Sequence, residues 1–457
     1  MAIETRLGDL RRALAGEVIL PDDVRYDAAR TTFNGTIDRR PAAIAWPSSS
    51  ADVAAAVRWV RDTGLSIAVR CGGHSVAGHA VADGALVIDL RLLRDVTVDP
   101  ARRRAVAGGG ALWEDVDRAT TAYGLATPGG TFGDTGIGGL TLGGGLGFLM
   151  GTAGLTCDNL VRAEVVTADG SIVVAGDDGD PELLWALRGG GGNFGVVTSF
   201  EFRLHPLGLL YAGYLSVPQA VAGKTLEILA GLALEIPREL VLLAGGPSSL
   251  EAVPDSPAVF NVTVVYQGAR EEAERLIRPL LALPVARNGL APMSYIEVQE
   301  MSGRLPFGLR NYWKGHFIRD LDAAVIDASV AAMAGRPGPP SFLLLEAMTG
   351  AAREEPPGGA AFGQREARWN VSGIGIWEDP ADDAAQIAWV RDYADALLPA
   401  SLTGAGYGNY APHDEPAERV RAAFGAERFG RLQRIKRRYD PDNVFRFNHN
   451  IPPGATG

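Results

Sequence analysis

The amino-acid sequence predicts an α+β protein with at least two domains. Short strand-like and helix-like patterns alternate along the chain, and its 58 glycines are concentrated between Gly72 and Gly195. After His205-Pro206 the amphipathic stretches become longer and glycine becomes sparser, which predicts a domain boundary there. The length of 457 residues allows two or three packed units, so a large buried core is expected.

The first region is predicted to contain short elements joined by glycine-rich loops. Residues 50–62 (SADVAAAVRWVRD) predict a helix with Ser50 as its N-cap and Asp52 in its first turn. A second helix is expected over residues 111–123, after a strand over residues 104–107. Further short strands are expected over residues 42–46, 66–70, 85–90, 162–167 and 171–174.

The second region is predicted to be one sheet with helices on one face. Strand-like runs occupy residues 259–266, 341–349 and 369–377, and the clearest helical patterns occupy residues 270–281 and 381–397. The connection over residues 351–363 is rich in glycine, proline and charge, so we expect it to be mobile. Residues 427–438 predict a basic amphipathic helix whose Lys436, Arg437 and Arg438 form a solvated terminus.

The composition is that of a globular protein and argues against several partners. The net charge of −11 and the isoelectric point near 5.2 disfavour a nucleic acid or an anionic membrane surface. No apolar run reaches the roughly 18 residues of a membrane span. Residues 1–12 have no apolar core of signal-peptide length, so we expect a cytoplasmic protein. Cys71 and Cys157 show neither disulfide nor metal spacing, so we expect two small buried residues and no metal.

Three common motifs fail when they are tested against their context. Residues 190–195 match GxGxxG, but a β-branched run follows where a dinucleotide-binding helix should begin. Gly223-Lys224-Thr225 resembles the end of a P-loop, but Pro218 occupies the position of its first glycine. No GxSxG elbow is present. The sequence therefore disfavours a Rossmann enzyme, a P-loop nucleotidase and a serine hydrolase of that type.

Two glycine-rich segments remain as candidates for a cofactor site. The first is RCGGHS at residues 70–75, directly after a predicted strand. Consecutive glycines there allow backbone N–H groups to turn toward one anion, as in a pyrophosphate-binding nest. The second is GIGGLTLGGGLG at residues 136–147. So many glycines are costly unless a ligand or another backbone lies against them, and a flexible loop is the alternative explanation.

These segments and several others resemble one enzyme family. Five segments are similar to motifs of the vanillyl-alcohol-oxidase superfamily of FAD enzymes. They are RCGGHSVAG, TPGGTFGDTGIGGLTLGGGLGFL, GLTCDNL, ELLWALRGGGGNFGVVTSFEFRLHP and YDPDNVFRFNHNIPP. The closer resemblance is to its berberine-bridge-enzyme-like branch and to bacterial 6-hydroxynicotine-oxidase-type members. It covers residues 41–205 and 407–453. The resemblance implies a PCMH-type FAD-binding domain over residues 1–205, with its core at 38–205. It also implies a substrate domain over residues 206–405, in which helices cover an antiparallel sheet. A C-terminal segment over residues 406–457 is expected to return to the FAD domain.

The resemblance implies FAD attached covalently through His74. In the family the histidine of the GGHS loop bonds to the flavin 8α carbon, and His74 occupies that position. Many relatives add a second link through a cysteine, but Phe132 stands at that position here, so we expect a single link. His79 lies five residues further along and is a weaker candidate for the link. A turn histidine beside noncovalently bound FAD is the alternative.

The resemblance also implies further site residues. Tyr407 and Asn409, which form a YxN motif, are the expected catalytic residues, together with Asn370. The positions expected to contact FAD, besides His74, are Arg70, Cys71, Gly72, Gly73, Ser75, Gly78, His79, Gly130, Thr131, Thr135, Gly138, Gly139, Thr141, Leu142, Asn159, Val197, Asn448 and Asn450.

The identity of the catalytic base stays open at the level of sequence. A tyrosine with the usual pKa of about 10 is a poor base, so Tyr407 needs a cationic or hydrogen-bonding neighbour, or else it orients the substrate. Relatives often add an acidic or polar group from a central strand, but residues 369–377 offer only Asn370 and Ser372. An aromatic patch formed by Tyr312, Trp313 and His316 is expected either to line the pocket or to belong to the core or rim.

The resemblance therefore predicts an FAD-dependent oxidoreductase that transfers hydride from a small alcohol, sugar or amine to flavin N5, with dioxygen as the reoxidant. The expected partners are a small-molecule substrate and dioxygen, with no nucleic acid and no membrane; the oligomeric state stays open. One alternative is a dehydrogenase that uses another electron acceptor. Another is a flavin-binding protein without turnover.

Overall fold

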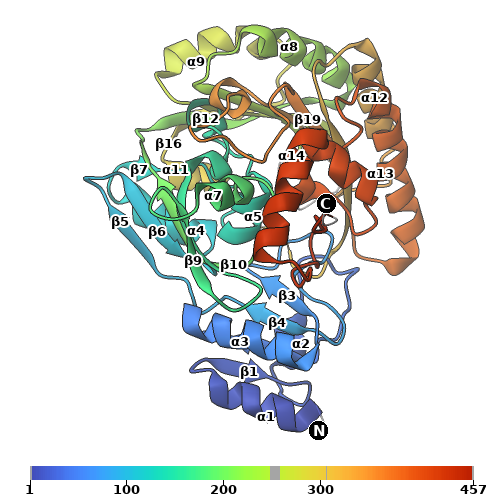
Figure 1. Cartoon of the computed structure of the whole chain (residues 1–457). Coiled ribbons are helices and arrows are strands. Elements are labelled where there is room, and N and C mark those ends of the chain that lie inside the picture. The colour runs from blue at the N-terminus through green and yellow to red at the C-terminus, as the bar shows by residue number, and fades with distance from the viewer. Residues whose placement is uncertain (1–2, 247–257, 305, 455–457) are drawn as a thin grey trace.

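The structure is a computed structural model that describes residues 3–246, 258–304 and 306–454. A lower lobe is built on two small sheets, and an upper lobe is built on one large sheet (Figure 1). The C-terminal segment runs back between the lobes at the front of this view, so the C-terminus lies near their junction. The predicted α+β fold class is confirmed.

The first small sheet contains the strand that precedes the predicted GGHS loop. In spatial order its strands are β1 (Glu17–Ile19), β2 (Ala43–Trp46), β4 (Leu86–Asp89) and β3 (Ile67–Arg70). Strand β4 runs parallel to both β2 and β3, and helix α3 (Ser50–Thr63) connects those two strands. The N-cap of α3 is Ser49 and not the predicted Ser50, because the Ser49 hydroxyl accepts the Asp52 backbone N–H at 3.2 Å.

The second sheet is antiparallel and carries the rest of the lower lobe. Its strands, in spatial order, are β5 (Val96–Asp99), β6 (Arg104–Gly108), β10 (Val196–Arg203), β8 (Leu160–Val166) and β9 (Ile172–Gly176). Helices α4 (Trp113–Thr121) and α7 (Pro181–Leu187) share a core with it. Strands β7 (Leu125–Ala126) and β11 (His205–Pro206) then pair just before the chain enters the upper lobe.

The upper lobe is an antiparallel sheet with helices on one face, as predicted. Its strands, in spatial order, are β15 (Arg287–Asn288), β12 (Leu210–Pro218), β14 (Val259–Tyr266), β13 (Leu240–Gly245), β18 (Phe342–Ala347), β19 (Trp369–Trp377) and β17 (Arg310–Ile318), and β16 (Ala291–Met293) pairs with β12. The covering helices are α8 (Ala222–Glu235), α9 (Arg270–Leu276), α10 (Arg278–Leu281), α12 (Ala323–Ala334) and α13 (Asp383–Leu397). The opposite face of the sheet turns toward the lower lobe (Figure 1).

The predicted single helix over residues 270–281 is wrong in one respect. It breaks into α9 and α10 at Ile277, whose backbone leaves the helical region. Pro279 follows this break, and a proline has no backbone N–H to continue a helix across it.

Short elements complete the described chain. They are α1 (Ile3–Ala13), α2 (Tyr26–Arg30), α5 (Ile137–Gly143), α6 (Met150–Ala153), α11 (Tyr295–Glu300), and the 3-10 turns η1 (Thr156–Asn159), η2 (Gln219–Val221), η3 (Gly350–Arg353), η4 (Pro380–Asp382), η5 (Leu398–Ala400) and η6 (Gly408–Tyr410). Helix α5 lies inside the second glycine-rich segment, so this segment is not the flexible loop that was its alternative explanation.

The connection over residues 351–363, which we expected to be mobile, is packed against the lower lobe. Ala361 and Phe362 are buried, and their backbone N–H groups donate to the carbonyl oxygens of Trp185 and Arg188 at 3.1 and 3.0 Å. The Arg188 guanidinium in turn donates to the Pro357 carbonyl at 2.8 Å. The composition of the segment indicated a mobile loop, but these hydrogen bonds hold it against the lower lobe.

The C-terminal helix α14 (Ala417–Tyr439) begins ten residues before the predicted start at residue 427 and bends at Gly425, whose φ is +73°. The prediction that Lys436 lies in solvent is wrong, because its side chain is 0% exposed. The Lys436 ammonium donates to Asp440 at 2.6 Å and to the carbonyl oxygens of Asn193 and Phe445 at 2.8 and 2.9 Å. These three bonds fasten the end of the chain to the lower lobe.

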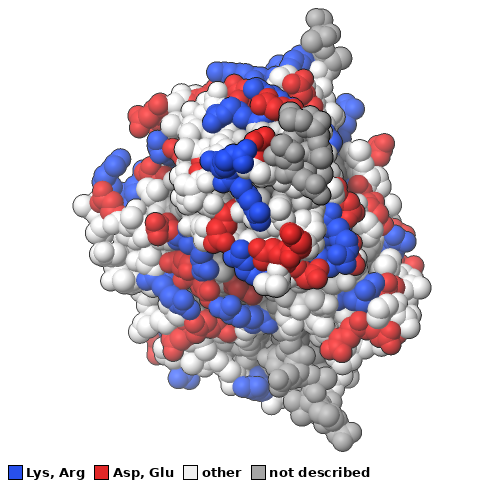
Figure 2. Space-filling model, turned by 90° about the horizontal axis from the view of Figure 1, so that it is seen from below, with Lys and Arg blue, Asp and Glu red and all other residues white. Residues whose placement is uncertain are grey.

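The surface carries both signs of charge. On the face seen from below, Lys and Arg side chains are interspersed with Asp and Glu side chains (Figure 2). None of the helices within the described ranges combines the length and the apolar character that a membrane crossing requires.

We expect Lys436→Ala to lower the free energy of unfolding by about 3–5 kcal/mol, because Asp440 is left buried without its cation. Chemical denaturation followed by tryptophan fluorescence measures this change. The matched control is Arg438→Ala, two residues along the same helix, where the side chain is 65% exposed and pairs with Asp180. This control should cost less than about 1 kcal/mol. Equal effects of the two variants would contradict the buried pairing.

Candidate active site

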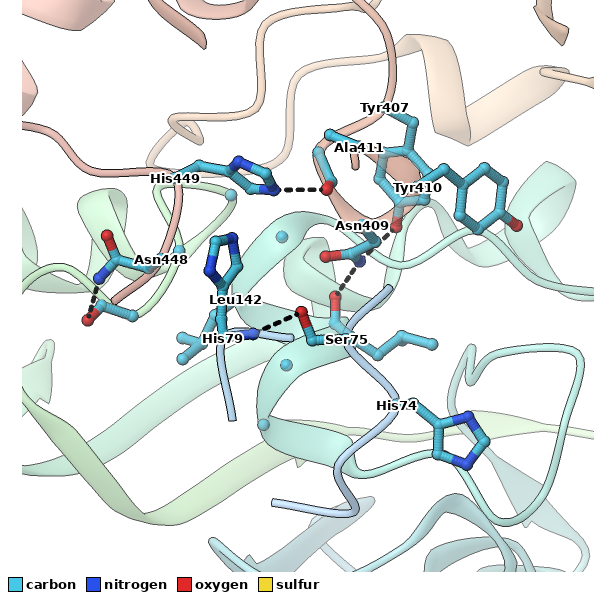
Figure 3. A pocket seen from close by; sticks show the side chains of 18 of the residues that line it. His74, Ser75, His79, Leu142, Tyr407, Asn409, Tyr410, Ala411, Asn448 and His449 are labelled. Atoms are coloured by element: carbon cyan, nitrogen blue, oxygen red, sulfur yellow. Dashed lines mark hydrogen bonds between the residues drawn. The ribbon is translucent and has the colours of Figure 1, made fainter. Parts of the chain in front are cut away.

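One large cavity lies where the lower lobe, the upper sheet and the C-terminal segment meet. Its volume is about 370 Å³, which is in the range of small-molecule sites. Figure 3 shows how residues from distant parts of the chain converge on it. The predicted site residues that line it are Cys71, Gly73, His74, Ser75, His79, Gly130, Thr131, Thr135, Gly138, Gly139, Leu142, Val197, Tyr407, Asn409 and Asn448.

The two glycine-rich segments touch each other directly along one wall. A Cβ at Gly72 would lie 2.5 Å from the backbone nitrogen of Gly136, and a Cβ at Gly136 would lie 2.6 Å from the Cys71 sulfur. Gly72 also has a φ of +56°, a conformation that other residues rarely adopt. These glycines are therefore required for contact between two backbones.

Other glycines border open space. A Cβ built on Gly139 or Gly192 would meet no atom within 4 Å, although both residues line the cavity. This is the arrangement expected where a ligand approaches the backbone closely. The cavity wall thus has the form of a cradle for a large cofactor.

His74 lies at one end of the cavity wall, apart from the other histidines (Figure 3). Its ring stacks on Phe33 at 5.0 Å between centroids and meets the edge of Phe307 at 5.1 Å. The Nε2 atom lies 3.6 Å from a carboxylate oxygen of Asp134. Both of these atoms are buried and have no hydrogen-bond partner among the described residues.

His79 and His449 lie together in another part of the cavity, with ring centroids 4.9 Å apart (Figure 3). Burial lowers the pKa of both rings, so both are neutral at physiological pH. The Nε2 of His449 donates to the Gly408 carbonyl at 2.8 Å, whereas the buried Nε2 of His79 has no partner within the described chain. His79 therefore has an unused polar atom for a ligand.

The Tyr407 hydroxyl accepts two hydrogen bonds, from the Gly145 backbone N–H at 2.7 Å and from the Asn409 side chain at 2.8 Å. Burial raises the pKa of Tyr407 above its usual value, and the two donated hydrogen bonds only partly oppose this effect. No cationic neighbour among the described residues lowers this pKa, so Tyr407 is a poor base. Its own proton has no acceptor in the described part of the chain and can be donated to a ligand.

The carboxylate that the sequence analysis did not find lies on β18. Glu346 is 1% exposed and accepts hydrogen bonds from Asn370 at 2.6 Å and from the Tyr410 hydroxyl at 3.2 Å. Burial raises the pKa of Glu346 to about 7, despite these two hydrogen bonds. Glu346 and Asn370 sit behind Tyr410, which itself lines the cavity. The only sequence signal was a single carboxylate inside the apolar strand SFLLLEAM.

The predicted aromatic patch is split by the pleat of β17. Trp313 lines the cavity, whereas Tyr312 and His316 lie on the opposite face of the sheet. Tyr312 hydrogen-bonds Asp414 and Arg391, and His316 contacts Ser401 at 2.9 Å. Of these three residues, Trp313 alone can therefore contact a ligand in the cavity.

Comparison with known proteins identifies the family. The FAD binding domain family matches residues 41–176, and the berberine and berberine-like family matches residues 406–452. The chain is 36% identical to (R)-6-hydroxynicotine oxidase of Paenarthrobacter nicotinovorans, over 96% of this chain and 97% of that protein. The chain belongs to the berberine-bridge-like FAD-linked oxidoreductases. It is an FAD-dependent enzyme, as the sequence motifs predicted.

A further relative and a solved structure support the assignment. An uncharacterized FAD-linked oxidoreductase of Bacillus subtilis is 30% identical over 96% of this chain and 97% of that protein. The crystal structure of 6-hydroxy-D-nicotine oxidase from Arthrobacter nicotinovorans superposes with a TM-score of 0.88 at 32% identity, over 96% of this chain and 98% of that one. The similarity extends through the upper lobe, where the sequence motifs were weak.

Some residues that we expected to contact FAD have other positions. Arg70 lies behind the GGHS loop, where it donates to the Ala29 carbonyl at 2.8 Å and packs against Gly73. The Asn159 amide is fully used by Ala153, Leu155 and His205. Both side chains therefore support the loops of the cofactor domain. The predicted site residues outside the cavity lining are Arg70, Gly72, Gly78, Thr141, Asn159, Asn370 and Asn450.

The segment rejected as a dinucleotide fingerprint nevertheless borders the site. Gly189, Gly190, Gly191, Gly192 and Gly195 all line the cavity. Strand β10 follows these glycines and no helix begins there, so they do not form a Rossmann motif. They border the cavity in a different backbone context. Among the described residues, no group of His, Cys, Asp or Glu is arranged to hold a metal ion.

We expect Gly139→Ala to lower flavin occupancy without destabilising the apoprotein. The new Cβ would project into open cavity space, and alanine favours helix α5 over glycine by about 1 kcal/mol. FAD content per chain and the melting temperature of the apoprotein measure the two effects. Gly231→Ala, at an equally open position in helix α8, is the matched control and should retain full flavin. Full flavin occupancy in both variants would contradict the cradle.

Proposed function

We propose that this protein carries FAD on a single covalent link through His74 and oxidises a small alcohol, sugar or amine. When bound, FAD would accept hydride from the substrate carbon, with dioxygen as the final electron acceptor. The observation that carries the proposal is the convergence of His74, the glycine cradle and Tyr407 on one cavity. We also propose a cytoplasmic location, which suits the two free cysteines.

The residues present fit FAD. The glycine-rich segments at residues 70–75, 136–147 and 189–195 would hold it, since their backbones line the cavity and several leave room where a Cβ would stand. When bound, FAD supplies the hydride acceptor. Neutral His79, with its unpartnered Nε2, adds a polar contact for the cofactor. Phe132 stands where a second link would form, which supports a single attachment at His74.

The substrate would lie against the lower face of the upper sheet. There the cavity wall is formed by Trp313 and Phe317 of β17, Phe342 and Leu344 of β18, and Ile374 of β19. These side chains are apolar, apart from the indole N–H of Trp313, which donates to Asn311 at 3.1 Å. An apolar wall favours an alcohol or amine with an apolar or aromatic body over a sugar.

Two tyrosines have different roles at this end of the cavity. Tyr407 orients the substrate by donating a hydrogen bond from its hydroxyl group, because its oxygen already accepts two hydrogen bonds. Tyr410 lines the cavity and donates to Glu346, so its oxygen can take the O–H or N–H proton of the substrate as its own proton passes to the carboxylate. Glu346 is thus the terminal proton acceptor, and Asn370 holds it in place.

A dehydrogenase that uses another electron acceptor is the second candidate. Stopped-flow mixing of the reduced enzyme with air-saturated buffer separates the two, because an oxidase reoxidises rapidly and forms hydrogen peroxide. Anaerobic titration against a panel of amines and alcohols, with (R)-6-hydroxynicotine included, tests turnover itself. Absence of flavin bleaching by the entire panel would favour a flavin-binding protein without turnover.

We expect the wild-type protein to stay yellow after precipitation with acid, because the flavin is covalently held. His74→Ala should release FAD into the supernatant, while His79→Ala should retain it in the pellet. Absorbance of both fractions at the flavin maximum measures the result. A colourless wild-type pellet would disprove the covalent link.

We expect kcat/KM to rise with pH through about 7, since the Glu346 carboxylate must be ionised to accept a proton and burial raises its pKa to about 7. Glu346→Gln should lower kcat/KM by about 100-fold and remove this acidic limb. The probe is the amine or alcohol from the panel that bleaches the flavin. Glu366→Gln, on an exposed loop, is the matched control and should keep the wild-type profile. Persistence of the limb in Glu346→Gln would show that another group accepts the proton.

A further inference from the structure

We propose that Asp134 is a positioning residue for the covalent attachment of FAD, because it holds His74 in the tautomer whose Nδ1 can attack the flavin. This inference rests on the proposed link through His74 and adds the group that makes this histidine reactive. Asp134 lies two residues after Phe132, in the loop that leads into the second glycine-rich segment.

The first observation is a pair of buried polar atoms that face each other. His74 Nε2 and the nearer oxygen of Asp134 are 3.6 Å apart, and neither has a hydrogen-bond partner in the described chain. The two side chains are only 13% and 10% exposed. A buried carboxylate oxygen without a donor is costly, and so is a buried ring N–H without an acceptor. A shortening of this distance by several tenths of an ångström would give a hydrogen bond that satisfies both atoms.

The second observation is that neighbouring groups hold both the His74 ring and the Asp134 loop. The imidazole lies between the face of Phe33 and the edge of Phe307, with interplanar angles of 18° and 88°. The Asp134 loop is held by two backbone hydrogen bonds at the start of α4, from Trp113 to the Thr135 carbonyl at 3.0 Å and from Glu114 to the Gly133 carbonyl at 2.8 Å. These contacts hold the ring and the carboxylate so that they face each other.

The chemical consequence follows from the two nitrogens of imidazole. A carboxylate can only accept a hydrogen bond, so it selects the tautomer that carries its proton on Nε2. The lone pair is then on Nδ1, which makes no hydrogen bond with the described residues, and the His74 residue lines the cavity. Asp134 also stabilises the positive charge that develops on the ring as Nδ1 forms its new bond.

The attachment of FAD to His74 is an oxidation whose atoms and electrons balance. One C–H bond of the flavin 8α-methyl group breaks, and one bond forms between its carbon and His74 Nδ1. The proton from the methyl group and the Nε2 proton are released, with Asp134 as the first acceptor of the latter. Two electrons remain on the flavin, and dioxygen takes these electrons and two protons to become hydrogen peroxide. No other co-reactant is needed.

The test measures the rate of attachment, not turnover. Full-length apoprotein from riboflavin-limited cells is mixed with FAD in air, and acid-stable flavin is followed with time. Asp134→Asn should lower the initial rate by about 100-fold, a typical contribution of a positioned proton acceptor. Asp134→Glu should recover much of the rate, and added formate should partly rescue Asp134→Ala. Asp62→Asn, on the exposed end of α3, is the matched control and should attach flavin at the wild-type rate.

A separate measurement distinguishes activation of His74 from simple support of the loop. Noncovalent FAD affinity is compared between His74→Ala and the double variant His74→Ala/Asp134→Asn, and it should be equal in the two. Attachment by Asp134→Asn at the wild-type rate would overturn the role of Asp134 alone. A weaker affinity in the double variant would also overturn it, because Asp134 would then serve binding. Absence of acid-stable flavin in the wild type would overturn both this inference and the proposed link.

Discussion

The direct contact between two backbones, at Gly72 and Gly136, is the constraint on which the rest of the site depends. Neither position has room for a Cβ, so two segments far apart in the sequence approach as closely as main chains can. This contact sets the distance between the loop that carries His74 and helix α5, and thereby the width of the cavity wall. The buried anchors around it, such as Arg70 behind Gly73, stabilise that spacing without contacting the cavity.

The parts of the fold and site that could be predicted are those with local signals. Glycine spacing, the run 369–377 and the helical period of residues 50–62 each depend on neighbouring residues, and the structure reproduces them within a few positions. The cap of that helix was misplaced by one residue, because Ser49 and Ser50 are equally suitable by composition. Family motifs then supplied the cofactor and fifteen of the residues that line the cavity.

The missed features depend on contacts between distant segments. Glu346 and Asn370 meet only because β18 and β19 pair, and neither strand alone indicates a proton acceptor. Lys436 looks like a solvated charge in a basic helix, yet its carbonyl partners Asn193 and Phe445 lie elsewhere in the chain. The pleat of β17 separates Trp313 from Tyr312, a distinction that requires knowledge of which face of the sheet is covered.

The return of the C-terminal segment has a consequence for biosynthesis. Tyr407, Asn448 and His449 line the same cavity as His74, and Lys436 fastens this segment to Asn193. A ribosome makes His74 several hundred residues before these partners, so the cavity has no complete wall while the chain is still being synthesised. The order of residues along the chain therefore means that the cavity is completed only after the C-terminal segment has been synthesised, and until then the wall that this segment supplies is missing.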